Sequence, residues 1–146
     1  MLSATTTYCY LTVIEYPKRK GFWGLLSMPI FYIVLFIKKN IVTYKLLGCG
    51  KNGRFSVMPD PNMWAILTAV NEDVNTLNFT TFLTTITHTF IYKWLHYFGC
   101  KATVYKLLPL QSHGNWSGKN YFKPQQPIED YKGKIAVITR ATIKIH

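Results

Sequence analysis

The chain has 146 residues, which is room for one domain with a single modest core. Hydrophobic residues make up 49% and aromatic residues 16%, which excludes a disordered chain and favours a large apolar pocket or contact with lipid. The net charge of +11 comes mostly from dispersed lysines, so we expect attraction to anionic surfaces rather than one base-reading motif.

Cysteine usage is sparse. Cys9, Cys49 and Cys100 are odd in number and too far apart for a disulfide framework or a Cys-x-x-Cys metal site. We therefore expect reduced thiols and a cytoplasmic protein, with contact at the membrane surface as an open alternative.

The first predicted element is a strand over residues 5–16, rich in β-branched and aromatic residues and closed by Pro17. A charge-free run follows at 21–37, with basic residues on both sides. A helix of this length rises about 26 Å, short of the roughly 30 Å hydrocarbon core of a bilayer. Pro29 in its middle is expected to kink the helix. We interpret the run as a helix covering a sheet, and a membrane span stays open as the alternative.

Two further strands are predicted at 41–47 and 63–70, with the Pro-Asp-Pro segment 59–61 as a turn before the second. Residues 74–98 carry apolar side chains three or four positions apart, which predicts a helix with the polar residues 71–73 as its N-terminal cap. The sequence then predicts a strand at 102–108 and a trailing strand at 134–145.

The predicted order is β-α-β-β-α-β followed by one trailing strand, which indicates a ferredoxin-like α+β module spanning residues 1–146. In this arrangement the strands on either side of the run 21–37 pair within one sheet. A membrane span between them would prevent that pairing, so the order favours the covering helix.

Several binding motifs are missing or only superficially present. The glycines at 48–53 lack the Gly-x-x-x-x-Gly-Lys-[Ser/Thr] spacing and lead to no predicted helix, which argues against nucleotide binding. The strand 63–70 lacks the aromatic pattern of an RNA-recognition motif, so we expect no nucleic acid partner. The segment 112–122 suits either the rim of a pocket or a structural loop with Trp116 packed over the sheet edge.

Four histidines are possible haem or metal ligands: His88, His96, His113 and His146. On a continuous helix His88 falls opposite the apolar stripe and His96 at its edge, whereas His113 lies in the glycine-rich loop and His146 at the chain end. For each, an ordinary surface histidine fits the local pattern better than a ligand. No zinc-protease motif or Ser-His-Asp order is present, and Glu72-Asp73 suits a helix start better than a catalytic pair.

Five segments together resemble the spheroidene monooxygenase family: 44–50 (YKLLGCG), 55–60 (FSVMPD), 64–67 (WAIL), 108–118 (LPLQSHGNWSG) and 138–143 (ITRATI). The resemblance implies ferredoxin-like modules of the dimeric α/β-barrel type and haem-dependent oxygenation of an acyclic carotenoid, which receives a keto group at C-2. It also implies an external electron donor such as ferredoxin. The chain is similar to the family's first module plus the first strand of a second.

From this resemblance we expect haem or a long apolar ligand between the sheet and the helices 21–37 and 74–98. The candidate pocket residues are Phe82, Phe90, Trp94 and Trp116, and at most one of His113, His96 and His88 is expected to bind haem iron. Two alternatives stay open. One is a catalytically silent module that forms a homodimer through its sheet and binds an apolar ligand. The other is a membrane-anchored protein that uses residues 21–37.

Overall fold

The computed structural model describes residues 5–37, 41–51, 59–73, 90–111, 118–119, 121–122 and 132–138. Its elements in chain order are β1 (Thr5–Glu15), a short 3-10 turn (Lys18–Lys20), α1 (Gly21–Phe36), β2 (Ile41–Gly50), β3 (Pro59–Asp73), α3 (Phe90–Phe98) and β4 (Lys101–Leu107). The predicted strands at 5–16, 41–47, 63–70 and 102–108 and the predicted helix at 21–37 are therefore confirmed.

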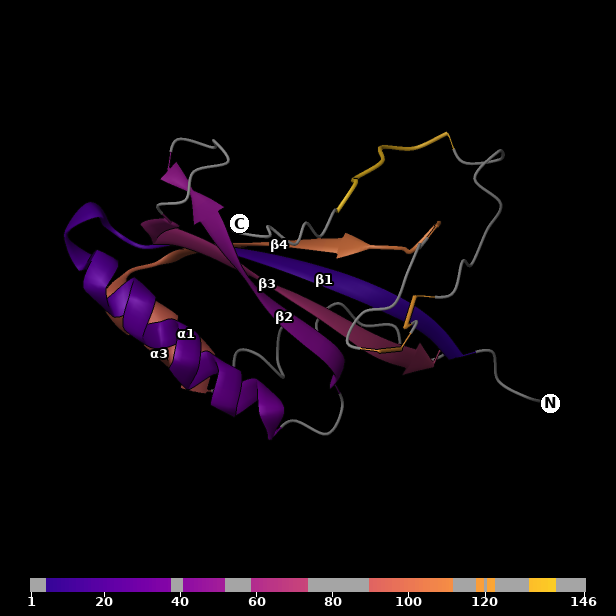
Figure 1. Cartoon of the computed structure of the whole chain (residues 1–146), viewed down its shortest axis with the longest axis horizontal. Coiled ribbons are helices and arrows are strands. Elements are labelled where there is room, and N and C mark those ends of the chain that lie inside the picture. Colours follow the sequence, from indigo (N-terminus) through magenta and orange to yellow (C-terminus); the bar gives the residue numbers. More distant parts are fainter. Residues whose placement is uncertain are drawn as a thin grey trace, which may run out of the picture.

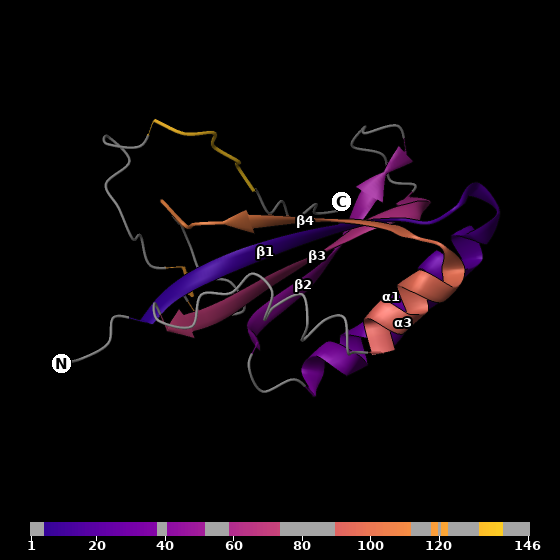
Figure 2. The same ribbon diagram turned by 180° about the vertical axis from the view of Figure 1, so that it is seen from behind.

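The four strands form one sheet in the order β2-β3-β1-β4, and all neighbouring strands run antiparallel. Leu11 on β1 pairs with Leu67 on β3 and with Tyr105 on β4. Helices α1 and α3 lie side by side against the same face of the sheet (Figures 1 and 2). This is the ferredoxin-like α+β arrangement predicted from the order of elements.

Helix α1 turns its smallest residues towards the sheet. Gly21, Gly24 and Ser27 are buried, and a Cβ atom added at Gly24 would overlap the carbonyl oxygen of Pro61 on β3. The missing side chains let the helix backbone approach the strand closely. The helix continues through Pro29, and no helix among the described residues is long and apolar enough to cross a membrane. Helix α1 is packed against the sheet, as the interpretation of the run 21–37 as a covering helix predicted.

Helix α3 ends in a Schellman motif. Gly99 adopts a positive φ of 66°, and its N–H bonds to the carbonyl of His96 at 3.1 Å. The N–H of Cys100 bonds to the carbonyl of Leu95 at 2.9 Å. These bonds satisfy carbonyls that the helix end would leave unpaired, and they lead the chain directly into β4.

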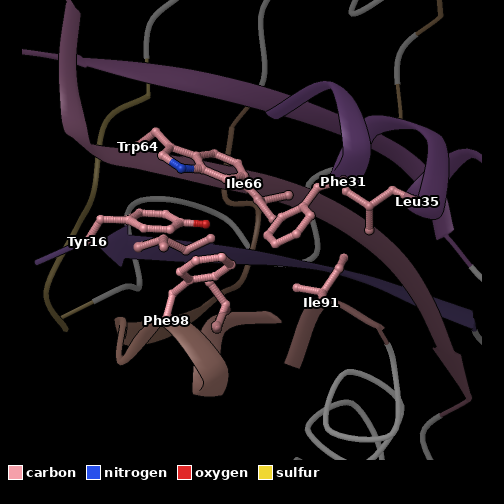
Figure 3. Packing of buried hydrophobic residues seen from close by; sticks show 9 residues of the cluster. Tyr16, Phe31, Leu35, Trp64, Ile66, Ile91 and Phe98 are labelled. Carbon is pink, nitrogen blue, oxygen red and sulfur yellow. The ribbon is translucent and has the colours of Figure 1, made fainter. Parts of the chain in front are cut away.

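The main core fills the layer between the sheet and the two helices (Figure 3). Its central side chains, Ile14 from β1, Phe31 from α1 and Trp64 from β3, are almost completely buried. The ring centroids of Phe31 and Trp64 are 5.5 Å apart. The other buried members are Tyr16, Leu35, Ile66, Ile91, Leu95 and Phe98.

Both ends of β3 differ from the sequence prediction. The expected turn at 59–61 and the expected helix cap at 71–73 are both wrong, because these residues are the two ends of β3. The N-terminal end of β3 is held by pairing of Pro59 with Gly50, and its C-terminal end by pairing of residues 71–73 with the start of β1. Continued pairing with a neighbour overrides the local turn and cap signals.

The trailing strand and the second helix are only partly described. Residues 134–138 form no strand, so the prediction of 134–145 is wrong over that part. Their apolar side chains are exposed and they join neither edge of the four-stranded sheet. A strand forms through its ladder of hydrogen bonds, which this segment lacks. The predicted helix 74–98 is confirmed over 90–98, and residues 74–89 and 139–145 lie outside the described residues.

Candidate functional site

Tyr16, the residue next after β1, forms side-chain hydrogen bonds with both helices. Its hydroxyl donates to Oγ of Ser27 on α1 at 2.8 Å and accepts from Nε1 of Trp94 on α3 at 3.0 Å. Ser27 in turn donates to the carbonyl of Gly24 at 2.6 Å. The cluster therefore satisfies the buried hydroxyl of Ser27 and fixes both helices to the end of β1.

The titratable groups of this cluster are held neutral. Burial raises the pKa of Tyr16 to about 12, against the smaller opposite effect of its hydrogen bond with Ser27. Burial also raises the pKa of the Cys100 thiol to about 11, partly offset by Tyr16 and by the charge of Lys20. A neutral phenol whose donor and acceptor positions are both occupied is poorly placed to accept a proton from a substrate. We assign this cluster a structural role.

Two of the four aromatic pocket candidates lie together on α3. The ring centroids of Phe90 and Trp94 are 5.7 Å apart. Trp94 is half-buried, and its ring centroid lies 6.3 Å from that of Trp23 and 6.2 Å from that of Phe31, both on α1. It therefore packs between the two helices. Phe82 and Trp116 lie outside the described residues.

His96 is the one candidate haem ligand that the structure describes. It lies on the exposed side of α3, where its ring is 6.1 Å from the ring of Tyr92. The helix buries Ile91, Leu95 and Phe98 instead, so His96 does not face the core. His88 and His113 lie outside the described residues, and among the described ones no three His, Cys, Asp or Glu side chains gather as a metal site would need.

The described part of the layer between sheet and helices does not fit haem. Phe31 and Trp64 meet there directly, and Gly24 leaves no space between α1 and β3. The indole Nε1 of Trp64 is buried without a hydrogen-bond partner among the described groups, on the side of the ring turned towards Tyr16 (Figure 3). An indole N–H is only a donor, so it cannot bind iron. Between α1 and the sheet, side chains therefore leave no room for the expected ligand. The part of its expected position beside residues 74–89 lies outside the described residues.

The opposite face of the sheet is a second apolar surface, which we call the outer face. Alternate residues of each strand point to it, and these residues pair across the sheet, as Leu11 does with Leu67 and Val13 with Ala65. Its members include Cys9, Leu11, Val13, Leu47, Ala65, Leu67, Ala69, Tyr105 and Leu107. Phe122 and Tyr121 pack against the end of this face near Cys9.

The residues of the outer face were not identified from the sequence, which predicted only that two copies could pair through the sheet, although β1 carried a signal for them. Cys9, Leu11 and Val13 alternate with Tyr10 and Ile14, so both sides of the strand are apolar. A strand that is apolar on both sides is covered on both sides, whereas a one-sided sheet shows a polar alternate row.

The outer face can bind apolar groups but offers little acid or base chemistry. Burial raises the pKa of the Cys9 thiol to about 12, so the thiolate that a nucleophile requires is not formed near neutral pH. Among the described residues the strand alternation places two cations on this face, Lys45 and Lys101, and Lys101 lies 3.6 Å from the carboxylate of Glu15 on the same face. The surface suits a long hydrocarbon or a second sheet.

Comparison with known proteins agrees with this architecture. No protein-family model matches the chain. The chain is 31% identical over 125 residues to spheroidene monooxygenase of Rhodobacter capsulatus, a match that covers 85% of this chain and 49% of the relative. The chain thus spans about half the length of the curated relative it matches.

Two solved structures resemble the chain, and the first of them shares its arrangement of elements. A dimeric ferredoxin-like protein from an uncultured marine organism superposes with a TM-score of 0.52 at 9% identity, covering 74% of this chain and 99% of its own. A protein of unknown function from Bacteroides thetaiotaomicron, described as a possible oxidoreductase, gives a TM-score of 0.49 at 7% identity over 72% of this chain and 99% of its own. The chain therefore has a ferredoxin-like fold, and its sequence resembles about half of spheroidene monooxygenase.

Proposed function

We propose that the chain is a module of a monooxygenase that acts on an acyclic carotenoid and introduces a keto group at C-2. The observation that carries this proposal is the similarity to spheroidene monooxygenase over 85% of the chain. The apolar outer face supports it, because a carotenoid polyene has almost no polar groups and is bound through buried hydrocarbon area.

Conversion of a methylene to a ketone takes two oxygenations. In the first, the methylene, one O₂, two electrons and two protons give a secondary alcohol and one water. The second uses the same reagents to give a geminal diol and water, and the diol loses a further water to leave the ketone. The four electrons must come from an external donor, for which a ferredoxin is our candidate.

Haem would supply the oxygen chemistry in this proposal, as the resemblance implies. The described residues form no site for it, so we derive no step through haem. If haem is bound, its ligand comes from residues outside the described part, where the predictions of His88 and His113 stand. The role of the described part is to hold the apolar substrate through the sheet.

The test is the absorption spectrum of the full chain, purified from cells supplied with haem precursor. We expect a Soret band, and a keto product when spheroidene, O₂ and a reduced ferredoxin are added, identified by chromatography and mass. A protein without haem that leaves spheroidene unchanged under these conditions contradicts the oxygenase proposal. Parallel spectra of His88→Ala and His113→Ala, with His96→Ala as the matched surface control, would identify the ligand.

A second candidate function is a catalytically silent homodimer that binds an apolar ligand between two sheets. The apolar outer face favours it, since one module leaves that face only partly covered by Phe122 and Tyr121 among the described residues. Two copies of the matched region would together span about the length of the relative. Its test is the mass of the purified protein by light scattering, where a monomer would contradict it.

A further inference from the structure

Helix α1 presents large apolar side chains on the side that faces away from the sheet. Phe22 and Phe36 are 71% and 75% exposed, although both are aromatic. The outward row has helical spacing and consists of Phe22, Leu25, Leu26, Pro29, Ile33 and Phe36. A surface helix of a globular protein normally shows the reverse pattern, with polar residues outward.

The neighbouring helix extends this surface. Trp23 of α1 stacks on Phe98 of α3 with ring centroids 5.0 Å apart, and Phe90 and Tyr97 of α3 are themselves exposed. Both helices lie on the same side of the molecule (Figures 1 and 2). The outer side of the helical layer is therefore apolar and aromatic, which we call the helical apolar face.

The charges beside the helical apolar face are positive. Lys18 and Arg19 are exposed one turn before α1, and the sequence continues after it with Lys38 and Lys39. Neither α1, the turn before it nor α3 contains an acidic residue. A second copy with a charge of +11 would bring like charges together at this face, whereas an anionic surface would neutralise them.

The outward row of α1 itself has no hydrogen-bonding side chain, and the two exposed aromatic residues that flank it on α1, Trp23 and Tyr32, each carry one polar group at the edge of a ring. The apolar side chains of this row match the acyl layer of an anionic bilayer, and the cations beside it match the headgroup layer. The 16 residues of α1 are anchored to the sheet by their small-residue side, so the helix can lie in the membrane plane and cannot cross it.

We propose that the helical apolar face docks the protein on anionic membranes, with α1 lying in the plane of the interface. Phe22, Ile33 and Phe36 enter the acyl boundary, and Lys18 and Arg19 contact lipid phosphates. This inference does not rest on the oxygenase proposal, since it requires neither haem nor carotenoid.

The test is flotation of the full chain with vesicles that contain no carotenoid. We expect flotation with vesicles of phosphatidylcholine and phosphatidylglycerol in equal parts, and much weaker flotation with phosphatidylcholine alone. The triple variant Phe22→Ser, Ile33→Ser, Phe36→Ser should bind the anionic vesicles roughly tenfold or more weakly. Because these side chains are exposed, its circular dichroism and thermal midpoint should match those of the parent chain.

The matched control is Val137→Ser, which removes an apolar side chain that is 82% exposed and lies outside the helices. It should float like the parent. A parent chain that stays with the soluble fraction, or a triple variant that floats as well as the control, overturns the proposal. So does a triple variant that changes the oligomeric mass in lipid-free buffer, because the face would then bind a second copy.

Trp23 gives an independent readout. It is the most exposed of the three described tryptophans, so vesicle binding should shift the fluorescence emission to shorter wavelength. Trp23→Phe should lose most of that shift while flotation persists. Flotation with an unchanged shift in Trp23→Phe contradicts the placement of α1 at the lipid.

Discussion

The hydroxyl of Tyr16 donates a hydrogen bond of 2.8 Å to Oγ of Ser27, and Ser27 has no exposed surface. Tyr16→Phe removes this donor and also the acceptor of Trp94 Nε1. We expect the free energy of unfolding to fall by about 1–3 kcal/mol, because buried polar groups lose their partners. Urea unfolding followed by circular dichroism measures the change.

Tyr97→Phe is the matched control for this variant. Tyr97 is 80% exposed, so loss of its hydroxyl should change stability by less than about 0.5 kcal/mol. Equal losses in the two variants would show that the cluster around Tyr16 does not hold the helices.

Gly24→Ala tests the close approach of α1 to the sheet. Alanine favours a helix by up to about 1 kcal/mol over glycine, but its Cβ would overlap the carbonyl oxygen of Pro61. We expect a net destabilisation of about 1–3 kcal/mol, since backbone on both sides must move. Gly48→Ala on β2 is the control, because an added Cβ there has no neighbour within 4 Å and should leave stability unchanged or slightly raised. A stabilised Gly24→Ala variant would contradict the packing.

Periodicity in the sequence located the two helices and four strands that the structure describes, but it did not orient α1. Strand residues such as those of β1 are β-branched or aromatic, and the repeat at Phe90, Trp94 and Phe98 predicted α3. A helix that is apolar on all sides has no preferred face by pattern. Its orientation follows from where the small residues Gly24 and Ser27 allow contact, which depends on the shape of the partner strand.

The candidate site was predicted less well for a related reason. Phe90 and Trp94 do lie together, but the space assumed beside them is filled by Phe31 and its neighbours. Exact filling of a core depends on side-chain shapes from several elements, which a single sequence read locally does not reveal. The apolar alternate row at Cys9 and Leu11 was visible in the sequence and indicated the outer face.

Stability should fall in alkaline solution because burial keeps Cys9 and Tyr16 neutral. The pKa of each is raised to about 12 in the folded protein, from ordinary values of 9.0 for the thiol and 10.0 for the phenol. The unfolded chain therefore loses these protons first as the pH rises. The stabilisation is complete below pH 9 and is lost as the pH approaches 12.

The measurement is urea unfolding under reducing conditions at several pH values from about 8 to about 11. Cys9→Ala should show a shallower decline of unfolding free energy with pH than the parent, because one of the shifted groups is gone. Identical slopes would mean that the Cys9 thiol is not held neutral by burial.

The outer face gives a prediction about assembly that separates it from the helical apolar face. If two copies pair sheet to sheet, the double variant Val13→Lys, Tyr105→Lys places ammonium groups of both copies at the contact. These groups repel one another and lose their water there, which weakens the dimer. Tyr105 is 51% exposed and Val13 lies on the neighbouring strand, so the folded monomer tolerates both lysines better than a dimer does. We expect light scattering to show a dimeric parent and a monomeric variant.

Phe22→Lys is the control, since it adds a positive charge at an exposed aromatic position on the helical apolar face. It should leave the dimer intact. Its effect on membrane docking should be limited to the contact of residue 22 with the acyl chains. A dimer that survives the paired lysines but dissociates with Phe22→Lys would show that the copies pair through the helical apolar face and not through the outer face. The sheets would then be free to bind apolar ligand singly, and the two helical layers would pair with each other instead of with lipid.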